Sequence, residues 1–435
     1  AAALPRRVTA GLPAVLACTL ALLLAAHVLK GASTMVSGEA PLGLLRPHVA
    51  SEDNLFSAVA RLWRSQAYCI VVLVALLSGV WPYAKLLLTL LCVKRVEAGA
   101  DDVRSALGRL RVLETLGKYS FADVFLVCCN CVIFDISTGG KYRIMGLFNL
   151  EVNLWMQIHL ACVLLFVAVT LSVFVTHWAI SELEALEASS DERVDEQADL
   201  EERSMEVAAA ASLPDSSPGL RPYQFLALAA AAAGAALLLA GASMPVVVVD
   251  RGGFLGKLIR PREQRDVRLS IASVFRRMLA SSSEHGGHDG LTLITAVLFV
   301  CLSLLAPLLE LLCLAAASVA ASRAKRLALC AADWCHSFAC VEILLLVAAA
   351  IVLELQTTIA FNLGDECRPF ESIMDDSSLL RLAGLGFAAS SECFAASPRF
   401  ARGGAALLLS VACRACAWRA LGGRRGAPGG GAKSV

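Results

Sequence analysis

The stretch Ser78-Gly79-Val80-Trp81-Pro82-Tyr83-Ala84-Lys85-Leu86-Leu87-Leu88 lies inside an apolar run from Ala67 to Val93, whose one charged residue is Lys85. As a helix this run is about 40 Å long at ~1.5 Å per residue, which is enough to cross a bilayer. Its proline removes a backbone hydrogen bond and predicts a kink. A lysine inside a membrane span is costly, so we expect Lys85 to face a partner or a wet cavity.

The same pattern occurs again later in the chain, in Ser303-Leu304-Leu305-Ala306-Pro307-Leu308-Leu309-Glu310-Leu311-Leu312. Serine, proline, an ionisable residue and two leucines stand at the same offsets. A second pair of related segments follows in the same order, Ser120-Phe121-Ala122-Asp123-Val124 and Ser337-Phe338-Ala339-Cys340-Val341. Two matches in one order predict an internal duplication.

The composition is that of a polytopic membrane protein. Of 435 residues, 57% are hydrophobic and 17% are charged, and the mean hydropathy is +0.68. A soluble protein of this length carries about 25% charged residues. The net charge of +1 gives no basis for nucleic-acid binding. Half of the 16 cysteines fall in apolar runs, where cysteine acts as a small hydrophobe.

We therefore predict an all-α membrane protein of two tandem four-helix modules, residues 1–180 and 221–421, followed by a flexible tail at 422–435. An acidic linker at 181–220 joins the modules. The expected spans, about eight in number, are residues 12–29, 67–93, 119–136, 152–180, 222–249, 291–319, 334–360 and 400–421. The last is the weakest, since Arg402 and Arg414 interrupt it.

Basic residues orient this multi-pass arrangement. With eight spans, Arg6 and Arg7, the 94–118 connection, Arg323–Arg326 and Arg424 with Arg425 all fall on one side. The positive-inside rule then places both termini and the acidic linker in the cytoplasm. Apolar and basic residues at 101–118 alternate with the spacing of an amphipathic helix, which we expect to lie on the membrane surface.

The intramembrane charges are the candidate pathway residues. Lys85 and Asp123 both lie in the cytoplasmic half of adjacent spans, so an ion pair between them is expected. That pair could form part of a transport pathway or only lock two helices together. In the second copy, Glu310 replaces the lysine and Glu342 lies two residues beyond Cys340.

Two carboxylates brought together in a low dielectric cannot both stay ionised cheaply. If Glu310 and Glu342 approach each other, one of them should hold a proton near neutral pH, as in a proton-coupled site. The alternative is that Glu342 reaches the interface or pairs with His336 or Arg326.

The remaining candidates are a proline and a serine in each copy. Pro82 and Pro307 free a carbonyl and could open a groove between helices, or could simply be packed around a kink. Ser78 and Ser303 lie one turn earlier and can satisfy freed backbone groups. Cys367 and Cys393 share one loop and could form a disulfide in an oxidising compartment. The sequence indicates no metal site, no cofactor and no enzyme constellation.

Two segments resemble a known family. Trp81-Pro82-Tyr83-Ala84-Lys85-Leu86-Leu87 and Leu116-Gly117-Lys118-Tyr119-Ser120-Phe121-Ala122-Asp123-Val124-Phe125 are similar to the paraquat-inducible protein A family (PqiA and its relative LetA), in particular to its eukaryotic, protist-type members. The resemblance implies duplicated four-helix modules and intermembrane transport of lipids or other hydrophobic molecules. It also implies membrane lipids as ligands and a separate MCE-type lipid-conduit protein as a partner.

Two other functions stay open on the sequence. The paired carboxylates would suit a proton-coupled transporter of a small solute. The loops and the acidic linker would suit a membrane scaffold that transports nothing.

Overall fold

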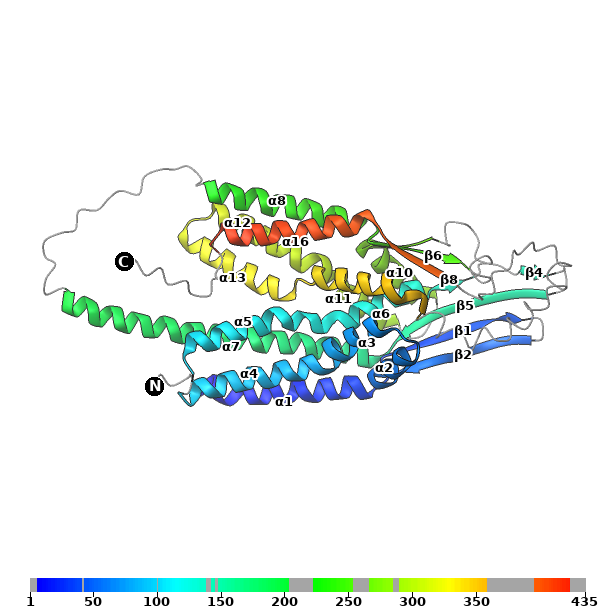
Figure 1. Cartoon of the computed structure of the whole chain (residues 1–435), viewed down its shortest axis with the longest axis horizontal. Helices are drawn as coiled ribbons and strands as arrows, with labels where there is room; N and C mark the ends of the chain where they lie inside the picture. The colour runs from blue at the N-terminus through cyan, green and yellow to red at the C-terminus, as the bar shows by residue number, and fades with distance from the viewer. Residues whose placement is uncertain are drawn as a thin grey trace.

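The computed structural model describes residues 6–40, 43–99, 101–137, 142–144, 148–202, 222–252, 266–284, 289–357 and 395–422. The chain falls into a first half that ends with the long helix α7 and a second half that begins with α8. Figure 1 shows the helices lying side by side along the long axis, with strands at one end. The beginning of α1 and the end of α16 lie at the opposite end.

The first half contains four helical passes and one sheet. Its elements in chain order are α1 (Arg6–Val28), β1 (Ala32–Ala40), β2 (Gly43–Asp53), α2 (Leu55–Arg64), α3 (Tyr68–Val72), the π-helix η1 (Leu73–Val80), α4 (Trp81–Glu97), α5 (Val103–Gly117), the 3-10 helix η2 (Lys118–Phe121), α6 (Ala122–Ile133), β3 (Ile136–Ser137), β4 (Tyr142–Ile144), β5 (Phe148–Ile158) and α7 (Leu160–Glu202).

The described part of the second half has elements in a similar order. They are α8 (Pro222–Ser243), β6 (Val247–Gly252), β7 (Asp266–Leu269), α10 (Ile271–Glu284), α11 (Asp289–Val300), the π-helix η4 (Cys301–Leu305), α12 (Ala306–Val319), α13 (Ser322–Phe338), an unlabelled helix at 341–357, β8 (Ala395–Phe400) and α16 (Arg402–Ala420).

Seven helical segments are long and apolar enough to cross a membrane. They are Gly11–Val28, Tyr68–Glu97, Val103–Ile133, Leu160–Glu187, Pro222–Ser243, Gly290–Val319 and Arg323–Thr357. Each overlaps one of the predicted spans, so the helical, multi-span prediction is confirmed. The eighth predicted span corresponds to α16, which is a helix but is not among the seven.

The prediction of an all-α fold is wrong, because two antiparallel sheets cover one end of the bundle. The first has the order β2-β1-β5-β3, with β4 paired to β5, and the second has the order β7-β6-β8. Residues 152–158 and 247–249, assigned to spans, lie in β5 and β6. The run Val246–Val249 is β-branched, and Val247 and Val249 are buried while Asp250 is exposed, which is typical of a strand.

The prediction of a surface helix at 101–118 is also wrong. The helix α5 packs along α7 and α4, and it continues through η2 into α6. Its apolar stripe of Ala106, Leu107, Leu110 and Leu113 is at most 6% exposed, so it faces protein. An apolar stripe with this spacing can face either a membrane surface or other helices, and in α5 it packs against other helices.

A short π-helix, called the π-turn below, precedes each of the two prolines. Pro82 and Pro307 are each the second residue of a helix that follows η1 or η4 directly. At the junction, the Trp81 N–H donates to the carbonyl of Leu76, and the Ala306 N–H donates to Cys301, both five residues back. These wide turns replace the simple proline kink that the sequence predicts, and π-turns are frequent at functional sites.

Candidate functional site

Arg414 is the centre of a buried ionic network in the second half. Its side chain, 4% exposed, comes from α16 and lies between two carboxylates. Its Nη1 atom donates to Glu310 Oε2 at 3.2 Å, and its Nη2 atom donates to Glu342 Oε1. Because a guanidinium presents several N–H donors in a fixed plane, one arginine can hold both acids.

Glu310 receives two more hydrogen bonds from neighbouring helices. His336 Nδ1 of α13 lies 2.6 Å from Glu310 Oε1, and the indole N–H of Trp418 donates to the same oxygen at 2.7 Å. Glu310 itself is fully buried. A buried carboxylate is tolerated when it is paired and hydrogen-bonded, and here two helices, α13 and α16, supply its partners.

The network continues into the first half through two residues one turn apart on α5 and η2. Lys118 Nζ lies 3.2 Å from Glu342 Oε2, with the lysine side chain 5% exposed. One turn earlier, Glu114 Oε1 accepts a hydrogen bond from Ser337 Oγ at 2.5 Å. Ser337 directly follows His336, so the two halves share one continuous set of polar contacts.

Lys85 lies next to this network in the first half. Its side chain is fully buried, and its Nζ atom donates to the backbone carbonyl of Ser172 on α7 at 3.1 Å. Its charge interacts favourably with that of Glu114. The lysine tail lies against Gly117, where an added Cβ would fall 2.3 Å from Nζ.

The predicted Lys85–Asp123 ion pair is wrong. Among the described residues, Lys85 bonds to the Ser172 carbonyl, and Asp123 belongs to no ion pair. Asp123 instead lines a cavity nearer the sheet end of the molecule. The 3-10 helix η2 begins at Lys118 and ends two residues before Asp123, and its tighter winding turns the aspartate to another face.

Arg414 decides between the alternatives left open for Glu310 and Glu342, because the two acids do not form a bare carboxylate pair. The guanidinium contacts both carboxylates, and Lys118 adds a second cation at Glu342. Two cations therefore offset the two negative charges. Of the alternatives, His336 does bind a carboxylate, but its partner is Glu310 rather than Glu342.

The predicted serines behave differently from each other. Ser303 Oγ donates to the carbonyl of Phe299 at 2.6 Å, as expected for a serine before a helix break. Ser78 is fully buried in η1, and among the described residues its hydroxyl has no hydrogen-bond partner. Pro82 and Pro307 are both buried, so they pack within the protein. Cys367 and Cys393 lie outside the described residues.

A cavity of about 130 Å³ lies between the first sheet, α2 and the helices around Asp123. Most of its wall is apolar, from residues such as Val74 of η1, Leu126 of α6 and Leu355 of the 341–357 helix. Its polar lining comes from Thr34, Arg61, Ser65, Asp123 and Asn130. Both halves of the chain contribute, because Ile351 and Leu355 belong to the second half.

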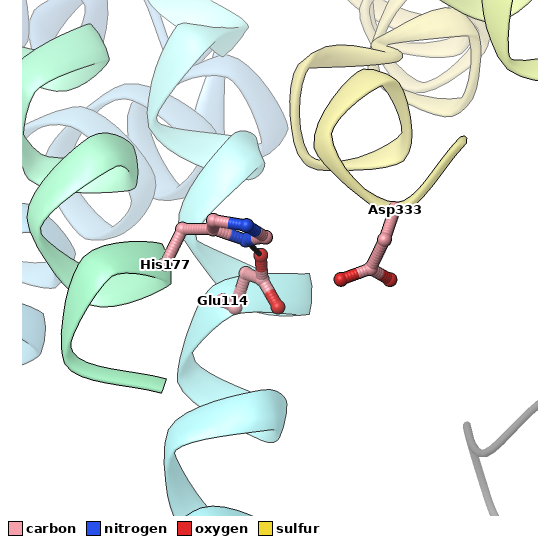
Figure 2. Close-up of side chains that lie close together, drawn as sticks. All are labelled: Glu114, His177 and Asp333. Atoms are coloured by element: carbon pink, nitrogen blue, oxygen red, sulfur yellow. Dashed lines mark hydrogen bonds and ion pairs between the residues drawn. The ribbon is translucent and has the colours of Figure 1, made fainter. Parts of the chain in front are cut away.

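Three side chains beside the ionic network, outside the cavity, could hold a metal ion. Glu114 on α5, His177 on α7 and Asp333 on α13 place one ligand atom each within 4.8 Å of one another (Figure 2). These residues lie far apart in the sequence, with whole helices between them, so no sequence motif contains them.

Sequence reasoning missed most of the network. In the sequence, Arg414 interrupts an apolar run, although an arginine in an apolar helix is itself a sign of a buried partner. Glu114 and Lys118 were assigned to a surface helix. His177 and Trp418 carried no signal, because polar residues near the ends of long apolar helices are common.

Comparison with known protein families gives a match in the first half of the chain. The family model of paraquat-inducible protein A matches residues 12–179. The comparison with curated proteins yielded no match, and neither did the comparison with solved structures. The matched range contains Lys85, Glu114, Lys118, Asp123 and His177. With its seven candidate spans, the chain is a multi-pass membrane protein whose residues 12–179 match the family model of paraquat-inducible protein A.

Proposed function

We propose that this protein takes part in the transport of lipids or other hydrophobic molecules between membranes. The observation that carries the proposal is the cavity beside η1 and α6. Its wall is mainly apolar, with one acid, one base and one amide among the lining residues. Such a lining suits an amphiphile, whose chain contacts the apolar wall and whose polar group meets Arg61, Asp123 or Asn130.

The position of the cavity supports access from the membrane. Its wall includes α3 and η1, which begin one candidate span, and α6, which ends another. The short helix α2 covers it with Ala58, Arg61 and Leu62, and no residue of α2 is buried. Phe56 and Trp63 of the same helix are 66% and 61% exposed, as in helices that lie in a membrane interface.

We further propose the arrangement that the family resemblance implies. The two halves are tandem four-helix modules that arose by duplication, with both termini in the cytoplasm. The protein is not an enzyme, and it hands its lipid to a separate MCE-type conduit protein. The parallel order of elements and the π-turn before Pro82 and Pro307 support the duplication.

The test is to fill the cavity and measure bound lipid. Ala58→Trp places a large side chain in the cavity wall, whereas Ala60→Trp changes an exposed position of the same helix. Each protein is purified in native-lipid particles, and lipids that remain after mild detergent extraction are identified by mass spectrometry. We expect a lipid class retained by the wild type and by Ala60→Trp to be lost from Ala58→Trp. Equal retention in all three would contradict the proposal.

A proton-coupled solute transporter is the second candidate, and the pairing of Glu310 and Glu342 with Arg414 weakens its main support. That function requires Glu310→Gln to abolish pH-dependent uptake into vesicles. A scaffold would instead lose partner binding on deletion of residues 182–206, with the Ala58→Trp variant unaffected.

A further inference from the structure

Three helices from both halves of the chain bring Glu114, His177 and Asp333 to one place. Figure 2 shows the imidazole of His177 against the carboxylate of Glu114, with Asp333 reaching toward them from α13. One ligand atom from each residue lies within 4.8 Å of the other two. Ligands bound to one ion at 2.0–2.2 Å stand roughly 3–4 Å apart, so small side-chain rotations bring all three into range.

Two of these side chains are already fixed in orientation. His177 Nδ1 lies 2.7 Å from Glu114 Oε1, and Ser337 Oγ donates to the same oxygen at 2.5 Å. The Trp334 ring packs on the imidazole with ring centroids 4.0 Å apart. The side chains of Glu114 and His177 are only 4% and 6% exposed, and Asp333 is half-buried. Of these contacts, the Ser337 hydrogen bond and the Trp334 ring support the ligands from outside, as around metal sites, whereas the His177–Glu114 hydrogen bond joins two ligands and would be exchanged for bonds to the ion.

The donor set indicates the kind of ion. Two carboxylates and a histidine nitrogen together form a three-ligand face for a cation. Imidazole with carboxylates suits Mn²⁺, Fe²⁺ or Zn²⁺, whereas Ca²⁺ takes six to eight oxygen ligands. We propose that Glu114, His177 and Asp333 bind a divalent transition-metal ion where the first half of the chain meets the second.

This site would act on the contact between the halves. Glu114 and His177 belong to α5 and α7, and Asp333 belongs to α13, so one ion joins two helices of the first half to one helix of the second. The same helices carry the Glu114–Ser337 hydrogen bond. Metal binding therefore adds to contacts that already hold the halves together, and its loss would loosen them.

The test uses the full chain in lipid nanodiscs, stripped of metal with EDTA and titrated with Mn²⁺. Manganese is the probe because the 16 cysteines would compete for Zn²⁺. We expect one equivalent of Mn²⁺ by electron paramagnetic resonance, with the nitrogen modulation of a bound imidazole. Asp333→Asn keeps the size of the side chain and should weaken binding at least about tenfold, while His177→Gln should remove the nitrogen modulation.

The control is Glu184→Gln, two turns from His177 on the same helix, where the acid pairs with Arg111. It should bind Mn²⁺ as the wild type does. Size-exclusion profiles show whether each variant stays folded and monodisperse. Binding well below one equivalent in the wild type, or equal binding by folded Asp333→Asn and Glu184→Gln, would overturn the metal site without affecting the lipid cavity.

Discussion

The buried tail of Lys85 fits because position 117 has no side chain. An added Cβ at Gly117 would lie 2.3 Å from Lys85 Nζ and 2.7 Å from Cε, which no real contact allows. Lysine tails usually move aside, but this one is fully enclosed and bonded to the Ser172 carbonyl. The position of the Lys85 side chain therefore depends on a glycine 32 residues away in sequence.

Gly117→Ala should therefore destabilise the protein, although alanine is the better helix former. We expect a loss of about 1–3 kcal/mol, the usual cost of overfilling a packed core, measured as a lower midpoint of thermal unfolding in detergent. Gly108→Ala is the matched control, since it lies on the same helix and meets nothing within 4 Å. That variant should be neutral or gain up to about 1 kcal/mol. An equal effect at both positions would contradict the role of Gly117.

Arg414→Ala should be the most damaging single change in the network. It leaves the fully buried Glu310 and the partly exposed Glu342 without their shared cation, and loss of a partner from a buried ion pair typically costs about 3–5 kcal/mol. Arg414→Lys keeps the charge but cannot hold both acids in one plane, so it should recover only part of the loss. Arg402→Ala, at an exposed position of the same helix, should change stability by less than about 0.5 kcal/mol. Thermal unfolding of the purified variants measures all three.

At the level of elements, the C-terminus of α6 is capped by a residue from the second half of the chain. Arg251 of β6 donates from Nη2 to the carbonyls of Val132 at 3.2 Å, Ile133 at 2.6 Å and Asp135 at 3.1 Å. These carbonyls lie at and just beyond the helix C-terminus, where backbone acceptors lack partners and a cation is favourable. Burial lowers the pKa of Arg251 to about 10, so the group is still charged at neutral pH.

Arg251→Met should loosen the end of α6 and the contact of the second sheet with it. Losing a charged donor that serves three carbonyls, two of them in buried hydrogen bonds, should cost about 2–4 kcal/mol. Hydrogen exchange of peptides covering residues 126–137 should rise in this variant. Arg268→Met, at an exposed position of the neighbouring strand β7, is the control and should leave those peptides unchanged. Unchanged exchange in Arg251→Met would mean that the cap is unimportant.

The helices were predictable because long apolar runs specify them, whereas the strands were not, because they depend on pairing with other strands. Long apolar runs predicted the helices, and the offsets around Pro82 and Pro307 predicted a disturbance in each. A strand such as β6 depends on its partners β7 and β8, which lie far along the chain, so the run Val246–Val249 read as the end of a helix. The π-turns depend on local hydrogen bonds that residue spacing does not specify.

On the scale of the whole molecule, the two halves share buried charge. Lys118 of the first half pairs with Glu342 of the second, which also binds Arg414. The cavity and the Glu114–His177–Asp333 cluster likewise draw on both halves. A change in one half is thus expected to reach the other through paired charges rather than through the acidic linker.

A double-mutant cycle on Lys118→Ala and Glu342→Ala measures this coupling. We expect a coupling free energy of about 1–3 kcal/mol from thermal unfolding, as for buried partners in one network. The exposed Lys94–Glu97 pair within α4 is the comparison, and its coupling should stay below about 0.5 kcal/mol. Additive effects at Lys118 and Glu342 would show that the halves are energetically independent.

The site could be predicted in part. Lys85, Glu310 and Glu342 were identified because charge in an apolar run is costly wherever it occurs. Their partners were not, because partner choice depends on how helices rotate and pack. The five-residue interval from Lys118 to Asp123 illustrates this. Because η2 is a 3-10 helix, the Lys118 side chain pairs with Glu342 while the Asp123 side chain lines the cavity.

The break between α13 and the helix at 341–357 has a consequence for how the chain can change in evolution. Ser337 and Glu342 flank this break, and they meet Glu114 and Lys118, which stand one turn apart on the facing helix. Inserting or deleting one residue at positions 339–340 would rotate everything after it by about 100°. The Ser337–Glu114 and Glu342–Lys118 contacts could then no longer both form. Among homologues, length changes should therefore be absent at this short break, even where they accumulate between the strands.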